Sequence, residues 1–241
     1  MIEMVRRFLR QKFGSPAIAI ALGVMALLTA VTAALSDPER ALSTGFVAIV
    51  LIAAGSVSKD ASGGALQMIL TRPIPRSTYL FGRYFGILAA YAIFLALTGA
   101  LTVLLANTLP RLPGARTPSG FAMLPLGRGL AGAFLDALLF AAILLFFSTF
   151  LRGYADVLAY VVLSIFLSLL PGFGRAIGKP WLQRGAEALR KNVLPDVDWS
   201  EVLRGHQVLA EPTGRWVLAV AVFLSLAAIV FSKREFSYGH D

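Results

Sequence analysis

Cysteine is absent from this chain of 241 residues. Its absence excludes disulfide bonds, thiolate metal sites and a cysteine nucleophile, and it leaves the redox compartment undetermined. Charged residues are also scarce, at 15%, where a soluble domain has about a quarter. Hydrophobic residues make up 57% of the chain, and the mean hydropathy is +0.75. This composition predicts a protein embedded in lipid.

The motifs of common catalytic and nucleotide-binding sites are missing as well. A phosphate-binding loop needs GxxxxGK[ST] after a strand. The nearest stretch, PGFGRAIGKPW, has Phe173 in place of the first glycine and Pro180 in place of the final Ser or Thr. HExxH and GxSxG are absent, and His206 and His240 lie far apart in the sequence. We therefore expect no catalysis, no metal site and no cofactor in this chain.

The formal net charge of +9 comes from 22 Lys and Arg residues against 13 Asp and Glu residues. The basic residues cluster at the ends of apolar runs instead of forming one amphipathic face. This distribution is typical of membrane flanks beside anionic lipid head groups. We therefore expect membrane lipid, and no nucleic acid, as a partner.

Six apolar segments are long enough, or nearly long enough, to cross a bilayer, which takes about 20 residues in a helix. Backbone polar groups in lipid must be satisfied internally, so these segments should be helical. The predicted fold is an all-α integral membrane protein with six transmembrane helices in one domain, 1–241. The six segments are Pro16–Leu35, Ala41–Val57, Tyr84–Asn107, Gly129–Leu151, Gly153–Leu170 and Gly214–Ser232.

The N-terminal residues predict both the orientation and an additional helix. Basic residues concentrate before the first span, whereas Arg40 is the only one in the short loop after it. Positive charge beside the first span favours the cytoplasmic side, so six crossings place both termini in the cytoplasm. The stretch 1–13, MIEMVRRFLRQKF, has Met1, Val5 and Phe8, together with Leu9, at helical spacing. It therefore predicts an amphipathic helix lying in the head-group plane.

The segment 58–83, SKDASGGALQMILTRPIPRSTYLFGR, joins the second and third predicted spans. The two prolines of TRPIPR disfavour helical geometry in the residues before them, so a rigid extended corner is expected. Ser77 or Thr78 can cap the helix that follows. In that helix, Gly82 and Gly86 form a small-xxx-small pair suited to close helix contact.

This segment resembles the loop between the second and third spans in the permease subunit of type-2 ATP-binding-cassette exporters. In that family an acidic residue is followed by Gly-Thr-Leu-Glu, Pro-Ile-Ser-Arg and Gly-Lys motifs. The matching residues are Asp60, Gly64-Ala65-Leu66-Gln67, Pro73-Ile74-Pro75-Arg76 and Gly82-Arg83. Ala65 departs from Thr, Gln67 from Glu and Pro75 from Ser. The change at Gln67 removes an acid that a salt bridge to the partner would need.

The resemblance implies a mechanical function. In such exporters this cytoplasmic loop is docked on a separate ATP-hydrolysing subunit, which binds ATP and Mg²⁺. Two permeases pair, as a homodimer or with a paralogue, in a bacterial or archaeal plasma membrane. The resemblance thus implies a permease that moves a substrate outward and is not itself an enzyme. The residues it assigns to coupling are Asp60, Gly64, Leu66, Gln67, Pro73, Pro75, Arg76, Gly82 and Arg83.

Two other functions are compatible with the sequence. A secondary transporter or channel driven by an ion gradient is expected to have several ionisable groups in the membrane and paired repeats. The chain offers one such group and no repeat. A non-transporting membrane anchor of an ATPase complex differs from a permease in lacking a cavity at the dimer interface. The sequence does not indicate a substrate.

Asp136 is the one ionisable residue well inside a predicted span. It lies roughly 10 Å from the outer interface at about 1.5 Å per residue, where a lipid-facing carboxylate costs on the order of 2–3 kcal/mol. It should therefore face protein or water. It either lines a translocation pathway or ties its helix to a neighbour near Asn107. Asp156 lies four residues after Arg152 near a span end, and a local ion pair is predicted there.

The predicted outer loop, 171–215, contains two helix patterns. PWLQRGAEALRKNV starts with proline and carries apolar residues at helical spacing. PDVDWSEVLRG has Asp196 or Asp198 as a cap and Gly205 at its end. Trp199 is an aromatic residue typical of a membrane interface. The resemblance implies outer helices that gate the exit, and an ordinary ordered surface loop is the alternative.

Overall fold

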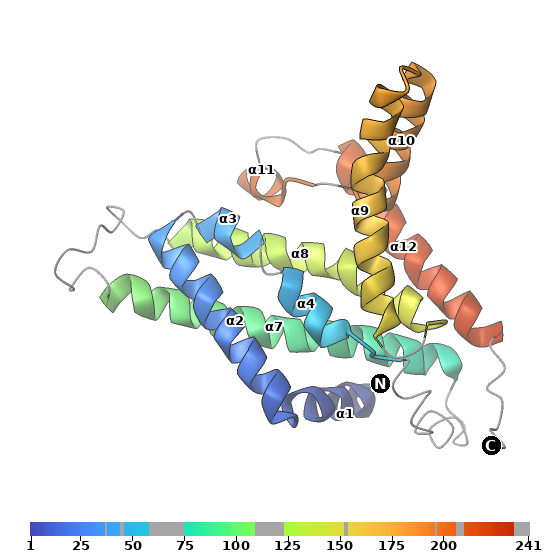
Figure 1. Cartoon of the computed structure of the whole chain (residues 1–241). Coiled ribbons are helices and arrows are strands. Elements are labelled where there is room, and N and C mark those ends of the chain that lie inside the picture. The colour runs from blue at the N-terminus through green and yellow to red at the C-terminus, as the bar shows by residue number, and fades with distance from the viewer. Residues whose placement is uncertain are drawn as a thin grey trace. The chain divides into compact units, whose positions relative to one another are not determined.

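The computed structural model describes residues 1–36, 38–43, 46–57, 75–108, 123–151, 154–195, 197–205 and 210–233. These residues form ten α-helices and no strand, which confirms the predicted all-α class (Figure 1). The helices are α1 Ile2–Phe13, α2 Pro16–Leu35, α3 Pro38–Ser43, α4 Phe46–Ala53, α7 Arg76–Thr108, α8 Met123–Ser148, α9 Ala155–Ala176, α10 Pro180–Val193, α11 Trp199–Arg204 and α12 Ala210–Lys233.

Five of these helices are long and apolar enough to cross a membrane. They correspond to five of the six predicted spans, and they make the chain a multi-pass membrane protein. A helix of about 20 residues covers the hydrocarbon thickness, and each of the five reaches that length. The five segments are Pro16–Leu35, Arg76–Thr108, Met123–Ser148, Ala155–Ala176 and Glu211–Lys233.

Residues 44–45 of the helix predicted over Ala41–Val57 lie outside the described residues, and the described part after them is α4, which ends at Ala53. α4 has eight residues, and at about 1.5 Å per residue it spans only about 12 Å of the roughly 30 Å of hydrocarbon. Gly55 follows α4 with a φ of 64°, a left-handed conformation typical of residues that end a helix. Ile49 and Ile52 of α4 are fully buried. α4 is therefore a core helix, and a sixth crossing stays a prediction.

α7 begins earlier than the predicted third span, and its 33 residues measure about 50 Å. The helix starts at Arg76, because the carbonyl of Pro75 accepts a hydrogen bond from the N–H of Tyr79 at 3.3 Å. Pro75 therefore occupies the cap position, and the caps predicted at Ser77 or Thr78 are wrong, because both residues lie inside the first turn of α7. The last part of the segment 58–83 is thus the first part of a long, continuous helix.

α9 and α10 form a helical hairpin (Figure 1). α9 continues through the buried Pro171 to Ala176, so the predicted outer loop starts later than expected. Proline is tolerated inside membrane helices because neighbouring groups satisfy the freed backbone. Gly178, with a φ of 71°, makes the turn into α10. Gly174 permits close packing, since a Cβ there would lie 2.7 Å from the backbone of Gln183.

The chain divides into two compact units. The first unit contains Met1–Ala53, Phe81–Ala141 and Asp198–Gln207, and the second contains Ala54–Leu80, Ala142–Val197 and Val208–Asp241. α11 therefore belongs to the first unit, whereas α10 and α12, which flank it in the sequence, belong to the second. Residues 198–207 are thus a short segment of the first unit inserted between two segments of the second unit.

On α2 the fully buried side chains are small, and large apolar side chains are exposed there and on α9. On α2, Ala26 and Ala30 are fully buried, whereas Ile20 and Leu28 are 67% and 62% exposed. On α9, Leu158 is 65% exposed. Small residues allow helices to approach one another closely in a membrane. Exposed apolar surface of this extent is costly in water, so lipid is its natural environment.

Candidate functional site

Only the last part of the segment predicted to couple to a motor subunit, residues 75–83, belongs to the described part of the chain. It includes Pro75, Arg76, Gly82 and Arg83. The other predicted coupling residues lie outside the described residues, namely Asp60, Gly64, Leu66, Gln67 and Pro73. The described contacts are therefore those of the chain directly before the segment, up to Val57, and those of its exit.

Two buried side chains hold the entry of the segment. The N–H of Gly55 donates to Oδ2 of Asp156 at 2.9 Å, and the N–H of Val57 donates to Oγ of Ser148 at 3.0 Å. Asp156 and Ser148 are both fully buried. An unpaired backbone N–H in such a place costs free energy comparable to a lost hydrogen bond. The two contacts, the entry anchors, therefore fix the chain directly before residue 58.

The sequence predicts a different partner for Asp156. Arg152, the expected ion-pair partner, lies outside the described residues, so that ion pair stays a prediction. Oδ1 of Asp156 accepts a further hydrogen bond from the N–H of Val157 at 2.9 Å. The carboxylate thus joins the first turn of α9 to the chain that follows α4.

The exit of the segment is held by the C-terminal end of α12. Nη1 of Arg76 donates to the backbone carbonyl of Ser232 at 2.9 Å. One turn further along α7, the ring of Tyr79 stacks on Phe231, with 5.6 Å between centroids and an interplanar angle of 16°. A cation beside the last carbonyls of a helix is favourable because those carbonyls lack partners in the helix. Pro75, at the corner, is exposed.

The predicted glycine pair makes a close helix contact, and its partner is α1. A Cβ at Gly82 would lie 3.0 Å from Cβ of Met4, and one at Gly86 would lie 2.9 Å from Cγ of Phe8. Phe8 is fully buried. Any larger side chain at Gly86 would therefore push α1 away from α7.

Arg83, which the sequence assigns to coupling, is engaged by α1. Its Nη1 donates to Oε1 of Gln11 at 3.0 Å, and its guanidinium lies 5.4 Å from the centroid of the Phe8 ring. The ammonium of Lys12 lies 5.7 Å from the centroid of that ring. Only 8% of Arg83 is exposed. This cation–π cluster stabilises the α1–α7 contact.

The predicted apolar face of α1 packs on protein through Phe8. Met1, which belongs to the predicted apolar face, is 61% exposed, whereas Phe8 of the same face is buried against α7. The basic residues Arg6, Arg7 and Arg10 are exposed. α1 is therefore a helix docked on protein, and its place in the head-group plane stays a prediction.

Asp136 binds a residue of the predicted outer loop. Its Oδ1 accepts a hydrogen bond from Nε1 of Trp199, on α11, at 2.7 Å. One turn earlier on α8, a Cβ at Gly132 would lie 3.1 Å from Cβ of Trp199. Asn107 is exposed, and within the described ranges no hydrogen bond joins it to Asp136. Asp136 was expected either to line a pathway or to tie its helix to a neighbour near Asn107. The structure contains such a tie, but it joins Asp136 to Trp199.

Charged residues hold the other end of α11. Arg204, the last residue of α11, pairs with Glu39 of α3, and Nη1 of Arg128 lies 3.9 Å from the same carboxylate. Only 7% of the Glu39 side chain is exposed. We call the contacts of α11 with Asp136, Gly132 and Glu39 the α11 latch. All of them lie within the first unit.

α11 itself forms because the sequence caps both of its ends. Oδ1 of Asp198 accepts from the N–H groups of Ser200 and Glu201 at 3.0 and 3.3 Å. The hydrogen bond from the Ser200 hydroxyl, followed by these backbone bonds, lowers the pKa of Asp198. Gly205, with a φ of 75°, ends the helix. The cap and the stop confirm two signals that the sequence displays.

The sequence indicates which polar residues in the spans need a partner, but it does not indicate what the partner is. Trp199 was identified only as an interface aromatic, and its bond to Asp136 spans 63 residues of sequence. Ser148 lies in the fourth predicted span, and its hydrogen bond to the N–H of Val57 was not predicted. A carboxylate or hydroxyl inside an apolar run is the one available signal, because such a group must find a partner.

The described residues contain no group of three or more His, Cys, Asp or Glu side chains able to hold a metal ion. No protein-family model and no curated protein matches the chain. In the residues that the structure describes, the geometry is that of a helical, multi-pass membrane protein, with contacts that hold residues 55–57 and the start of α7, and with a latched short helix.

Proposed function

We propose that the chain is the membrane-spanning permease subunit of an ATP-driven exporter. In this proposal the segment 58–83 receives force from a separate ATP-hydrolysing subunit. The observation that carries the proposal is the fixation of the chain directly before that segment and of the segment's exit. The entry is held by Ser148 and Asp156, and the exit is held by the α12 carbonyl of Ser232.

Fixed ends matter because a flexible connector absorbs displacement, whereas an anchored one transmits it. The entry anchors join the segment to the end of α8 and the start of α9. The exit joins it to the end of α12. The segment also continues directly into α7. A push on the segment therefore acts on four membrane helices through hydrogen bonds and continuous backbone.

The coupling residues divide into two groups in this proposal. Asp60, Gly64, Leu66, Gln67 and Pro73 belong to the part that meets the motor subunit, with Pro75 and Arg76 shaping its exit. Gly82 and Arg83 hold α7 against α1, which keeps the beginning of α7 in place. The motor subunit binds ATP and Mg²⁺, and the permease pairs with a second copy or a paralogue.

We assign the second crossing to Ala41–Val57, although α4 by itself is too short to span the membrane. Interrupted helices are tolerated at membrane depth where protein buries the exposed backbone, and one face of α4, with Ile49 and Ile52, is fully buried. Six crossings then place both termini in the cytoplasm of a bacterial or archaeal cell. In this topology α11 belongs to the predicted outer loop, and release of Asp136 from Trp199 accompanies passage of the substrate.

Co-purification from the native membrane tests the proposed function. The tagged chain is extracted in mild detergent, its partners are identified by mass spectrometry, and ATP hydrolysis is measured. We expect a stoichiometric partner carrying a phosphate-binding loop. The double variant Pro73→Gly with Arg76→Ala should release that partner. The matched control is Arg184→Ala, which removes an exposed arginine of α10 and should leave the complex intact.

A purified chain with no nucleotide-binding partner would contradict the proposal. Retention of the partner by the double variant would place the docking surface elsewhere. Thermal unfolding of the double variant must resemble that of the control, since loss of the fold would release any partner.

A further inference from the structure

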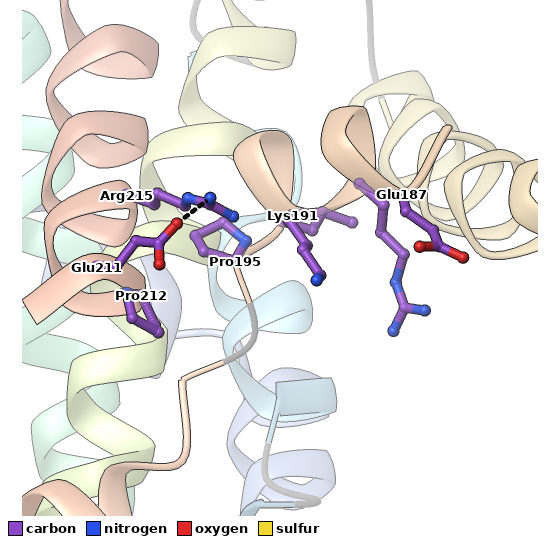
Figure 2. Close-up of a pocket in the computed structure, with 8 residues that line it drawn as sticks. Glu187, Lys191, Pro195, Glu211, Pro212 and Arg215 are labelled. Atoms are coloured by element: carbon purple, nitrogen blue, oxygen red, sulfur yellow. Dashed lines mark hydrogen bonds and ion pairs between the residues drawn. The ribbon is translucent and has the colours of Figure 1, made fainter. Parts of the chain in front are cut away.

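A cavity of about 330 Å³ lies within the second unit, where the end of α10 meets the beginning of α12. Three of its lining residues are apolar and five are charged. Figure 2 shows the side chain of Lys191 between Glu187 and the Glu211–Arg215 pair. We call this cavity the α10–α12 pocket. It is lined by Glu187, Arg190, Lys191, Leu194, Pro195, Glu211, Pro212 and Arg215.

The acidic groups of the pocket already have partners. Glu211 pairs with Arg215 one turn along α12 (Figure 2). Oε1 of Glu187 accepts a hydrogen bond from Nε2 of Gln183 at 2.9 Å and lies 3.8 Å from Nη2 of Arg175. The carboxylates therefore do not neutralise the remaining cations of the pocket.

Arg190 and Lys191 are those remaining cations. Both side chains are exposed, and neither makes a hydrogen bond or ion pair with another side chain in the described part of the chain. Their place in the last turn of α10 favours positive charge, because a helix C-terminus carries partial negative charge. That effect explains cations on the helix, but it does not require two of them beside a cavity.

The position of the pocket along α12 indicates the kind of anion. α12 is one of the five helices able to cross a membrane, and the pocket includes its first residues. Directly beyond the pocket, Val217 and Leu218 are 54% and 63% exposed, as expected of a lipid-facing surface. Charged groups at the start of such a face lie at head-group depth. Leu194 and Pro195 add an apolar wall beside them.

We propose that the α10–α12 pocket binds the phosphate of a membrane phospholipid. Arg190 and Lys191 contact the phosphate oxygens, and the apolar wall contacts the glycerol region. A cavity of this volume is at the small end of ligand sites, which suits one head group. Basic pockets beside membrane helices recognise anionic lipid through the same charges. The inference stands apart from the proposed function, since any multi-pass protein can carry such a site.

The test uses the purified full chain in nanodiscs of phosphatidylcholine containing phosphatidylglycerol. Native mass spectrometry counts the phosphatidylglycerol molecules that stay bound. The double variant Arg190→Gln with Lys191→Gln should bind phosphatidylglycerol on the order of tenfold more weakly. The matched control, Lys179→Gln with Arg184→Gln, removes the same charge from exposed positions outside the pocket, at the N-cap and in the second turn of α10. It should bind as the unchanged chain does.

A third variant, Arg190→Lys with Lys191→Arg, keeps both charges and should retain binding. Equal weakening in the pocket variant and the matched control would overturn the proposal, since only overall charge would then matter. Inorganic phosphate distinguishes the source of the anion. Displacement of phosphatidylglycerol by an equal concentration of inorganic phosphate would overturn the assignment to a lipid.

Discussion

Asp156 and Asp136 each place a carboxylate in a membrane helix, where it needs a hydrogen-bond donor, and the two find different kinds of donor. Asp156, in the second unit, is fully buried and accepts from the backbone N–H of Gly55. Asp136, in the first unit, is half-buried and accepts from the indole of Trp199 on a six-residue helix. The N–H of Gly55 can separate from Asp156 only if the backbone moves. The indole of Trp199 can separate from Asp136 when the short helix α11 moves. Asp156 is thus an anchor, and Asp136 belongs to a latch.

The largest effect is expected from breaking the anchor. Asp156→Ala leaves the N–H of Gly55 buried without its acceptor, which costs about 3 kcal/mol of unfolding free energy. Asp156→Asn keeps a side-chain oxygen and should recover most of that loss. Thermal unfolding of the purified chain measures both. Equal loss in the two variants would show that charge is the essential property, which would favour the ion pair predicted with Arg152.

Breaking the α11 latch should loosen α11 without destabilising the whole chain. Trp199→Phe keeps the ring against Gly132 but removes the indole N–H, at a cost of about 1–2 kcal/mol. Hydrogen–deuterium exchange of the α11 amides should accelerate about tenfold, while thermal unfolding of the whole chain changes little. The control Trp181→Phe alters a tryptophan that is 66% exposed. It should leave α11 exchange unchanged.

The cap of α11 should have a smaller effect, and one that depends on pH. Asp198→Ala removes the acceptor for two N–H groups and costs about 1 kcal/mol of local helix stability. The pKa of Asp198 is lowered in the folded state. The charged form therefore stabilises α11 above the pKa of an unfolded aspartate, and this stability is lost as pH falls through the lowered value. Protection of the α11 amides, taken relative to their intrinsic exchange rate at each pH, should fall in acid in the unchanged chain and not in the variant.

The smallest effect is expected at the charged end of the latch. Arg204 is partly exposed, with 37% of its side chain accessible, so its pairing with Glu39 is screened by water. Arg204→Gln should weaken α11 attachment by about 0.5 kcal/mol. Raising the salt concentration should reduce the difference between the unchanged chain and the variant. An effect as large as that of Trp199→Phe would place the latch in the ion pair and not in the indole bond.

Much of the fold could be predicted because its signals are local. Apolar runs of sufficient length marked five spans, and proline, aspartate and glycine marked the ends of α10 and α11. Where local signals were ambiguous, the predicted ends of helices were less accurate. Gly55, with a left-handed φ, follows the end of α4 shortly before the predicted end of the second span, and Pro171, expected to follow the fifth span, lies inside α9. Whether proline stops a membrane helix depends on neighbours that the sequence does not display.

Partners could not be predicted, because contacts between distant segments leave no periodic signal. Gly82 and Gly86 predicted a close helix contact, but nothing in their spacing indicates α1. Asp136 had to find a partner inside the protein, and the expected neighbour, Asn107, is not the one that binds it. An ion pair with Arg152 was predicted for Asp156. The carboxylate accepts a hydrogen bond from the backbone N–H of Gly55, which the sequence does not indicate.

The most direct test of the account is disulfide-independent cross-linking from single cysteines, for which this cysteine-free chain is a ready background. A photoreactive maleimide is attached at Ser62→Cys in the segment 58–83, at Ser77→Cys at the exposed start of α7, and at Asn192→Cys in α10. The account predicts cross-links from Ser62→Cys and Ser77→Cys to an ATP-hydrolysing subunit, strengthened by ATP, and none from Asn192→Cys. Cross-links only from Asn192→Cys, or none from any position, would contradict it.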